Sequence, residues 1–245
     1  MRYFVISLKK VWIVAIFLGL LTVGTIGYKG THATPSLVRT PGTFYMVDTK
    51  EKVVALTFDD GPDPLYTNKI LEILKAENIK ATFFILGKNA QLNPFILNNI
   101  VSEGHEIGNH GYSHDYHANM FINELIETDE VIFEIAKLHP HYYRPPGGLV
   151  PKGFVQSVMK NGYIITLWSI DSKDWQNPGA DKITRNVVKY IFPGAIILLH
   201  DGGDGREQTI KALPDIIQTL KKEGYHFITL SQLLQLKDDS VKVKS

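Results

Sequence analysis

The acids Asp59 and Asp60 closely follow the apolar run Val53–Leu56 and precede Gly61 and Pro62. Successive side chains of a strand point to opposite faces, so the turn that Gly and Pro predict can aim the two carboxylates differently. Two acids aimed in different directions suit two distinct chemical tasks. An Asp-rich β-turn without catalytic function is the alternative, and it is the simpler interpretation of this segment taken alone.

A second cluster contains His110 and His114, after the strand expected at 106–109. Two imidazoles four residues apart share one face of a helical turn, so they can hold one metal ion. Asp60 could add an oxygen ligand, which leaves a coordination position for water, as in catalytic zinc sites. Two solvated surface histidines are the alternative interpretation of this motif.

Three further clusters follow expected strands. Tyr143–Gly148 places an arginine next to a Pro-Gly turn, which suits a guanidinium held against a carboxylate and a turn N–H that faces a substrate. Asp171–Trp175 combines two acids with an aromatic ring, and that ring is either core packing or a platform for a sugar. The apolar stretch 196–199 ends at His200. For Arg144 the alternative is an arginine in a solvated loop. For His200 the alternative is a strand-end histidine that is simply hydrogen-bonded.

Strand and helix patterns alternate from Val53 onward, and the polar clusters follow strand ends. Repeated strand–helix units predict right-handed crossovers and a parallel sheet. In a parallel barrel the carboxyl ends of all strands lie on one face, where barrel enzymes build their sites. We therefore expect an α/β barrel of about seven strands. An open doubly wound sheet is the alternative, although the chain has no GxGxxG loop.

We expect seven strands and seven helices. The expected strands are 53–58, 81–85, 106–109, 142–144, 164–169, 195–199 and 226–229. The expected helices are 66–77, 94–103, 122–138, 153–161, 181–190, 209–223 and 231–236.

Composition excludes several classes of protein. The 26 basic and 25 acidic residues nearly balance, so no bulk charge favours a nucleic-acid partner. Cysteine is absent, which excludes disulfides, a thiolate nucleophile and Cys-based metal sites. A chain of 245 residues suits one globular domain with short ends, and we expect a monomer.

The first thirty residues differ in kind from the rest. Arg2, Lys9 and Lys10 precede an apolar run that continues to Gly27, with no further charge until Lys29. This pattern predicts a signal peptide or a membrane anchor, and it places the remaining chain outside the cytoplasm, either anchored or secreted. The expected organisation is 1–30 signal or transmembrane segment, 31–49 linker, 50–236 catalytic domain and 237–245 flexible tail.

Taken in chain order, the segments TFDDG, HxxxH, RPPxG, DSxDW and ILLHD resemble the five motifs of the polysaccharide deacetylase family, the NodB homology domain of carbohydrate esterase family 4. The resemblance covers residues 52–234. It implies a deformed (β/α)7-type barrel that binds one divalent metal ion, with zinc expected first and cobalt or another ion as alternatives. The implied function is removal of N-acetyl groups from N-acetylglucosamine-containing glycan of the cell envelope, such as peptidoglycan, a chitin-like polymer or an exopolysaccharide.

The resemblance also assigns roles to residues of this chain. Asp59 resembles the catalytic base, with Arg144 as the partner that orients it. His200 resembles the general acid, and Asp174 is the acid expected to orient it. The implied metal ligands are Asp60, His110 and His114. The residues implied to contact substrate are Trp175 and Leu198, which wall the acetyl pocket, together with Pro146 and Gly147, near which a backbone N–H binds the oxyanion.

Two positions depart from the family pattern. The second motif usually has Ser or Thr where Gly111 stands, so we expect altered rigidity in the loop that carries the ligands. The third motif commonly has Tyr where Gly147 stands, so an aromatic contact to substrate is missing, which affects specificity rather than activity. Two other functions stay open: an O-acetyl esterase of the xylan-active type with the same fold, and an inactive member that only binds glycan.

Overall fold

The computed structural model of the chain describes residues 42–117 and 120–242. The signal or anchor segment expected at 1–30 and most of the linker lie outside these described residues. Among the helices of the described ranges, none combines the length and apolar character needed to cross a membrane.

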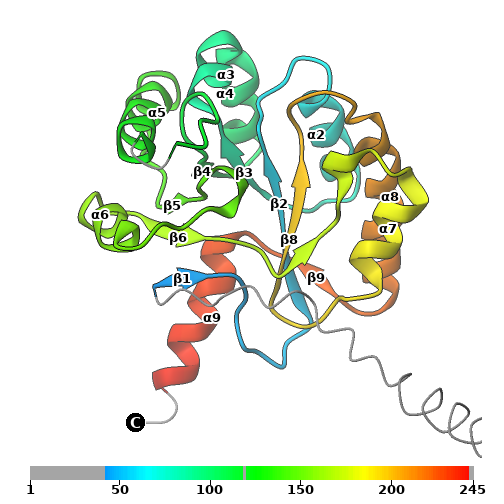
Figure 1. Cartoon of the computed structure of the whole chain (residues 1–245). Coiled ribbons are helices and arrows are strands. Elements are labelled where there is room, and N and C mark those ends of the chain that lie inside the picture. Colours follow the sequence, from blue (N-terminus) through cyan, green and yellow to red (C-terminus); the bar gives the residue numbers. More distant parts are fainter. Residues whose placement is uncertain (1–41, 118–119, 243–245) are drawn as a thin grey trace, which may run out of the picture. The chain divides into compact units, whose positions relative to one another are not determined.

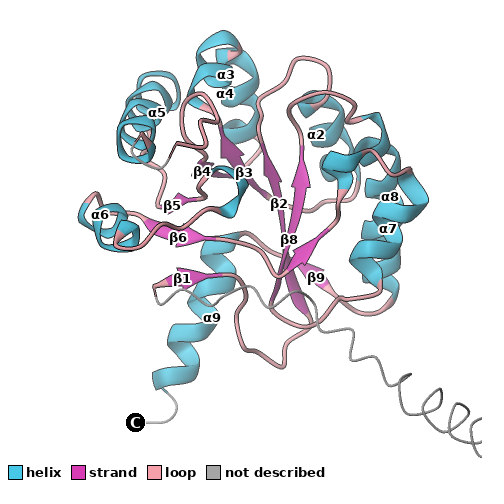
Figure 2. Ribbon diagram, viewed as in Figure 1, coloured by secondary structure: helices cyan, strands magenta, loops and turns pink. Residues whose placement is uncertain are grey.

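The described strands form one sheet in the order β1-β6-β5-β4-β3-β2-β8-β7, with β9 beside the start of β2. All eight strand pairings are parallel. The sheet curls, and helices cover its outer face (Figures 1 and 2). The strands are β1 (Thr43–Phe44), β2 (Val53–Asp59), β3 (Thr82–Ile85), β4 (Glu106–Asn109), β5 (Tyr142–Tyr143), β6 (Ile164–Thr166), β7 (Ile170–Asp171), β8 (Ala195–His200) and β9 (His226–Phe227).

The short segment between β6 and β7 connects the two sides of the curled sheet. Only residues 167–169 separate these strands, yet β6 pairs with β5 and β1 while β7 pairs with β8. The parallel, curled arrangement confirms the α/β class and a barrel-like architecture. The described residues contain nine strands rather than about seven. The strand β1 lies within the expected linker, and the strand expected at 164–169 ends at Thr166, after which a separate strand, β7, begins at Ile170.

The helices surround this sheet. In Figure 1, α7 and α8 lie side by side beyond β8, and α3, α4 and α5 cover the strands on the opposite side. The helices are α2 (Thr67–Ala76), α3 (Gly87–Leu92), α4 (Pro94–Ser102), α5 (Phe121–Ala136), α6 (Phe154–Lys160), α7 (Ala180–Val188), α8 (Glu207–Lys222) and α9 (Leu230–Lys242), with 3-10 turns at Pro146–Gly148 and Asp174–Gln176.

The alternation of side chains along β2 positions the chemistry. Leu56 and Phe58 face outward into the large core that the helices cover, and burying each contributes about 1.5–3 kcal/mol. Ala55 faces inward, toward a smaller core to which α9 contributes Leu230. Because the period of a strand is two, the last residue of β2, Asp59, also falls on the inner face.

Two expected boundaries differ from the structure. Part of the segment expected as linker belongs to the folded domain, since β1 pairs with β6 and Val47 is 2% exposed. The short closing helix expected at 231–236 is longer, because α9 continues to Lys242. Residues 43–47 therefore take part in the fold, and the closing helix extends past residue 236.

Candidate active site

The carboxylates of Asp59 and Asp60 point in different directions because the chain turns between them. Asp59 lies in extended backbone at the end of β2, whereas Asp60 has a φ of +75°. Asn89 donates from Nδ2 to the Asp60 carbonyl at 2.7 Å, and a Cβ at Gly202 would lie 2.1 Å from the same oxygen. The turn is therefore held between α3 and the segment that follows β8.

The structure corrects the helical turn that we expected at His110 and His114. Residues 110–117 form a loop, in which Gly111 has a φ of +84° and His114 a φ of +64°. Backbone with positive φ cannot continue a right-handed helix, and it favours glycine at position 111. The loop still brings the two imidazoles together, with ring centroids 5.2 Å apart.

Glu124 of α5 anchors this loop by hydrogen bonds. Its carboxylate accepts hydrogen bonds from the backbone N–H groups of Tyr112 and Ser113, at 2.7 and 2.6 Å, and from the Ser113 hydroxyl at 2.8 Å. Glu124 is 8% exposed, so these charge-assisted bonds form away from bulk water. A buried carboxylate thus steadies the loop at a point where Gly111 offers no hydroxyl.

Asp60, His110 and His114 form a cluster that fits a divalent metal ion. Their ligand atoms lie within 4.8 Å of one another, and Asp60 Oδ1 is 3.4 Å from Nε2 of each histidine. His110 Nδ1–H donates to the Arg144 carbonyl at 2.6 Å, which leaves its Nε2 lone pair free for a ligand bond. Among the described residues, the buried Asp60 Oδ1 has no hydrogen-bond partner. One carboxylate and two imidazoles are a donor set typical of zinc.

Charges within the cluster shift one another's pKa values. Burial opposes ionisation of Asp60, but the neighbouring His110 holds the pKa of Asp60 well below its ordinary value. Burial also opposes protonation of His110, while Asp59 and Asp60 outweigh it and raise the pKa of His110. Burial and then the charge of His110 lower the pKa of His114. A neutral His114 beside an ionised Asp60 suits cation binding.

Arg144 lies fully buried behind Asp59. Its Nη1 donates to Asp59 Oδ1 at 2.6 Å and to Thr57 Oγ1 at 2.9 Å. Nε and Nη2 donate to the carbonyls of Thr166 and Leu167, at 3.1 and 3.0 Å. Burial lowers the pKa of Arg144, and Asp59 opposes that shift. Arginine keeps its charge in proteins, and the contacts of Arg144 give the Asp59 carboxylate one orientation.

His200 at the end of β8 is held by Asp174. The imidazole Nδ1–H donates to Asp174 Oδ1 at 2.7 Å, and the His200 backbone N–H donates to Oδ2 at 2.8 Å. Thr209 of α8 also donates to Oδ2, at 2.9 Å. Burial opposes protonation of His200, but the bond to Asp174 outweighs it and raises the pKa of His200 to about 9. The imidazole therefore carries a proton at neutral pH.

Asp59 and His200 stand opposite each other on adjacent strands. In the parallel pairing of β2 with β8, these two residues are register partners. The backbone N–H of Asp201, the next residue, donates to the Asp59 carbonyl at 3.0 Å and continues the pairing beyond the strands. The ladder of the sheet thus sets the separation of the two groups.

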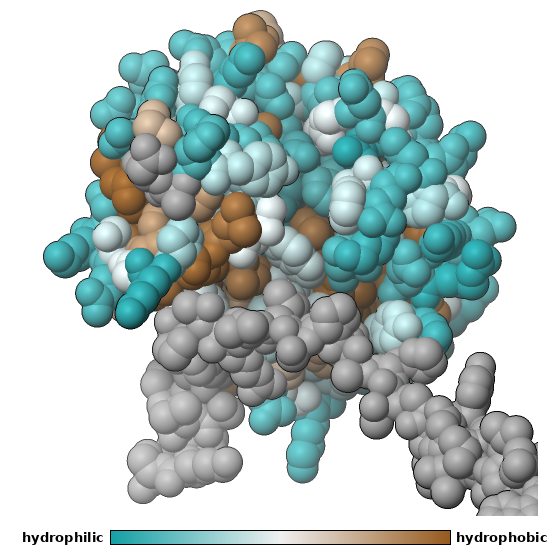
Figure 3. Space-filling model, viewed as in Figure 1, coloured by the Kyte–Doolittle hydropathy of each residue, from teal (hydrophilic) through white to brown (hydrophobic). Residues whose placement is uncertain are grey.

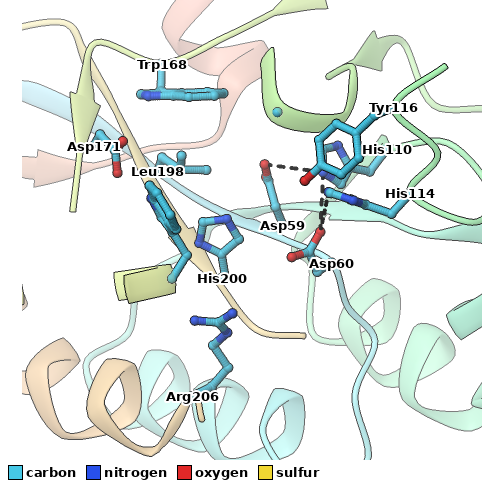
Figure 4. Close-up of a pocket in the computed structure, with 12 residues that line it drawn as sticks. Asp59, Asp60, His110, His114, Tyr116, Trp168, Asp171, Leu198, His200 and Arg206 are labelled. Atoms are coloured by element: carbon cyan, nitrogen blue, oxygen red, sulfur yellow. Dashed lines mark ion pairs between the residues drawn. The ribbon is translucent and has the colours of Figure 1, made fainter. Parts of the chain in front are cut away.

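A cavity of about 560 Å³ brings most of the expected site residues together. In the space-filling view, this face is hollowed near its centre, and hydrophobic atoms show within the hollow (Figure 3). Figure 4 shows the candidate metal-binding cluster, which consists of Asp60, His110 and His114, on one side of the cavity, with Trp168 and Asp171 on the other. The lining residues are Asp59, Asp60, His110, His114, Tyr116, Gly147, Trp168, Asp171, Trp175, Leu198, His200 and Arg206.

Three expected site residues do not line the cavity. Arg144 and Asp174 lie one layer behind it and contact Asp59 and His200. Pro146 is buried, and its ring packs under the ligand loop, with Cγ 3.9 Å from where a Cβ of Gly111 would lie.

Gly147 lines the cavity in an unusual backbone conformation. Its φ is +61°, and the turn around it is closed by the Gly148 N–H, which donates to the Pro145 carbonyl at 2.9 Å. Within the described part of the chain, the Gly147 N–H itself donates to no acceptor. A free backbone donor at the wall of a polar cavity can bind a developing negative charge.

Some residues of the site gave little signal in the sequence. Tyr116 and Arg206 line the cavity from loops with no recognisable motif. Trp168 could have been found from its place near the end of the expected strand 164–169. Glu124 and Thr209 act from helices, where a single polar residue on a buried face is indistinguishable from an ordinary helix residue.

Comparison with known proteins gives matches in both sequence and structure. The family model described as "Polysaccharide deacetylase" matches residues 46–165. A peptidoglycan-N-acetylglucosamine deacetylase of Bacillus cereus is 44% identical over 197 residues, which cover 78% of this chain and 92% of the relative.

Two solved structures are also similar to this chain. The Bc1960 peptidoglycan N-acetylglucosamine deacetylase has a TM-score of 0.75 and 40% identity, over 78% of this chain and 92% of that one. A family 4 acetyl xylan esterase from Clostridium thermocellum, solved with a cobalt ion, has a TM-score of 0.70 and 36% identity, over 76% of this chain and 92% of that one.

Proposed function

Because this chain belongs to the polysaccharide deacetylase family, we propose that it removes N-acetyl groups from N-acetylglucosamine residues of cell-envelope polysaccharide, with peptidoglycan as the first candidate substrate. The family assignment confirms the resemblance seen in the five motifs, and it makes the protein a hydrolase. The observation that carries the proposal is that Asp59, the metal-binding cluster and His200 line a single cavity.

In the proposed mechanism, Asp60, His110 and His114 hold a divalent ion, with zinc as the first choice and cobalt as an alternative. Such an ion supplies Lewis-acid chemistry, since it polarises a carbonyl and lowers the pKa of a water molecule. Asp59 acts as the general base that takes a proton from the attacking water. Its hydrogen bond to Arg144 keeps one carboxylate oxygen occupied and aims the other into the cavity.

His200 acts as the general acid in this proposal. Its Nδ1–H is committed to Asp174, so Nε2 is the nitrogen that can protonate the leaving amine. An amine leaves an amide poorly unless it is protonated as the bond breaks. A His200 pKa raised to about 9 keeps that proton in place at neutral pH.

The remaining cavity residues bind the substrate. The free N–H of Gly147 donates to the oxygen of the scissile carbonyl as negative charge develops there. Leu198 and Trp175 form apolar walls that take the acetyl methyl group, and both residues line the cavity. Leu198 is 3% exposed, so its side chain is held by the surrounding core.

We further propose that the enzyme works outside the cytoplasm. The supporting observations are the basic and then apolar pattern of residues 1–30 and the peptidoglycan named as substrate of its relatives. In this proposal the N-terminal segment is a signal peptide or a membrane anchor, and the domain acts on the wall as a monomer.

Hydrolysis of O-acetyl esters is the second candidate function. It is supported by the acetyl xylan esterase, which shares 36% identity with this chain. The same base, metal site and oxyanion donor serve both reactions, because an ester has the same carbonyl geometry. An alkoxide is a better leaving group than an amide nitrogen, so ester hydrolysis depends less on His200.

Release of acetate by the purified full-length chain, supplied with zinc or cobalt, separates these functions. The panel of substrates is peptidoglycan, chitotetraose and acetyl-xylan. Release from peptidoglycan or chitotetraose is expected, and release from acetyl-xylan alone would support the second candidate. Absence of acetate from all three substrates would contradict both.

The metal site has its own test. We expect chelation to stop acetate release and zinc or cobalt to restore it. His114→Ala should weaken zinc binding roughly 100-fold, because one of three protein ligands is lost. His117→Ala is the matched control, since that side chain lies in the same loop but is 80% exposed and pairs with Asp115. Equal zinc affinity in the two variants would contradict the assignment.

A further inference from the structure

Tyr116 lies over the mouth of the cavity, in the loop that carries the two histidines of the metal-binding cluster. The residue lines the cavity and is 58% exposed. Its ring meets the His114 ring edge to face, with centroids 4.9 Å apart. Figure 4 shows it on the side of His110 and His114, across the cavity from Trp168.

Tyr116 can occupy this position because Gly147 has no side chain. A Cβ at residue 147 would lie 2.9 Å from Tyr116 Cε1 and 3.6 Å from Cδ1. The first distance is shorter than carbon atoms tolerate without a shift. The φ of +61° at Gly147 also disfavours any residue with a Cβ. One glycine therefore permits both the turn and the approach of the ring.

Hydrogen bonds hold the loop on both sides of Tyr116. Asp115 Oδ1 accepts from the His117 backbone N–H at 2.8 Å, and Glu124 binds the backbone at Tyr112 and Ser113. The Tyr116 hydroxyl has no hydrogen-bond partner among the described residues. The loop thus holds an aromatic ring that remains 58% exposed at the cavity.

We propose that Tyr116 binds the substrate, with its ring against the apolar C–H face of the sugar whose acetamido group enters the cavity. This inference rests on the proposed function and adds a contact that selects for a pyranose ring. A half-exposed aromatic face gains free energy when an apolar sugar face displaces its water. The ring and Trp175 then both contact the sugar, since both line the cavity that also contains the metal-binding cluster and His200.

The first test separates binding of the sugar from the chemical step. Tyr116→Ala is expected to raise KM roughly tenfold while kcat changes by less than about threefold, because the contact exists before and during the reaction. Tyr116→Phe should restore the wild-type KM, since the ring rather than the hydroxyl makes the contact. Tyr190→Ala is the matched control, because that tyrosine is 39% exposed and does not line the cavity.

Zinc affinity of Tyr116→Ala is measured in parallel, because the ring also touches His114. We expect it to equal that of the wild type. An unchanged KM in Tyr116→Ala would overturn the proposal. So would a loss of zinc affinity that accounts for the loss of activity, since the ring would then support the metal site instead.

The second test uses Gly147→Ala, whose Cβ should displace the ring. We expect this substitution to raise KM in the wild-type background and to raise it less in Tyr116→Ala, where the backbone strain at residue 147 remains but the ring is already gone. An equal increase in both backgrounds would show that residue 147 acts independently of Tyr116, against the proposal. The comparison uses whichever acetylated glycan the wild type hydrolyses. If the proposed substrate is wrong, the wild type does not release acetate from it. If only the role of Tyr116 is wrong, the wild type is active and the KM values of the variants do not change as expected.

Discussion

Asp174 accepts two hydrogen bonds from His200, one from the ring Nδ1–H at 2.7 Å and one from the backbone N–H at 2.8 Å. The two bonds fix both the rotation of the imidazole and the site of its free nitrogen. They also favour the imidazolium, because a buried carboxylate stabilises a positive charge beside it. The same pair therefore controls the geometry and the protonation of the proposed general acid.

We predict that Asp174→Asn moves the alkaline limb of the activity profile to lower pH. The pKa of His200 is raised from 6.5 to about 9, so the acid form is present below the folded pKa and is lost as pH rises through it. A bound cation repels this proton, which places the wild-type limb somewhat below 9. Without the Asp174 carboxylate, burial lowers the pKa of His200 and only the charges of Asp60 and Asp59 oppose that shift. The rate of acetate release as a function of pH checks this, and an unmoved limb would contradict it.

Asp59→Asn is expected to lower kcat by roughly 10²–10⁴-fold, the usual contribution of a general base. Asparagine still offers Arg144 an acceptor oxygen, so the fold should persist. Zinc affinity should stay within a few-fold of the wild type, because Asp60 and the two histidines remain. Acetate release and zinc titration measure the two effects separately. Full activity in this variant would disprove the role of Asp59.

Arg144→Lys is expected to destabilise the domain by about 3–5 kcal/mol, measured as the free energy of unfolding in urea. The lysine ammonium cannot reproduce the planar set of guanidinium N–H donors that binds Asp59, Thr57 and two backbone carbonyls, so buried acceptors lose their donors. Arg185→Lys on the exposed face of α7 is the matched control and should change stability by less than about 0.5 kcal/mol. Similar losses in both variants would contradict this account.

Glu124→Gln should weaken zinc binding roughly tenfold, because residues that orient a metal ligand affect affinity without touching the ion. The neutral amide accepts the Tyr112 and Ser113 N–H bonds less strongly and leaves one of its own donors buried. Glu127→Gln changes an exposed residue on the same helix and should have no effect. The comparison of the two zinc affinities tests whether the carboxylate of α5 stabilises the ligand loop.

Asp201 should make the stability of the metal-free protein depend on pH. Burial raises the pKa of Asp201 from 3.8 to about 7, the Thr67 hydroxyl opposes the shift, and Asp60 and Asp59 add to it. The folded state therefore binds this proton more tightly than the unfolded chain. Its stabilising contribution is complete below pH 3.8 and is lost as pH rises through about 7. We expect a loss of roughly 1–3 kcal/mol over this interval that Asp201→Asn does not show. The free energy of unfolding is measured as a function of pH for both proteins, and the same pH dependence in the two would contradict this role of Asp201.

The regular elements could be predicted because their patterns are local. The strand at 106–109 has the expected bounds, and the ends of α2 and α5 lie within two residues of expectation. The helix α3 was missed, since Gly87–Leu92 has no apolar periodicity and is placed by its neighbours. The early end of the strand expected at 164–169 and the separate strand β7 after it were also invisible, because β6 and β7 pair with different partners near opposite edges of the sheet.

The site residues that lie at the ends of strands could be predicted from the sequence. Asp59 and His200 end β2 and β8, and His110 directly follows β4, so the parallel topology brings all three to one face. The path of the loop after His110 could not be predicted, because positive φ at Gly111 and His114 follows from long-range anchoring by Glu124. The burial of Arg144 depends on acceptors from two segments that are far from it in sequence, β2 and the residues at the end of β6, which no local pattern reveals.

The register pairing of Asp59 with His200 has an evolutionary consequence. The spacing of the two groups is part of the hydrogen-bonded ladder, so insertions or deletions in the surrounding loops leave it unchanged. Tyr116 belongs to a loop outside this ladder, so a change at Tyr116 would alter the proposed sugar contact without moving Asp59 or His200. Relatives of this chain can therefore diverge in substrate while inheriting one unaltered reaction.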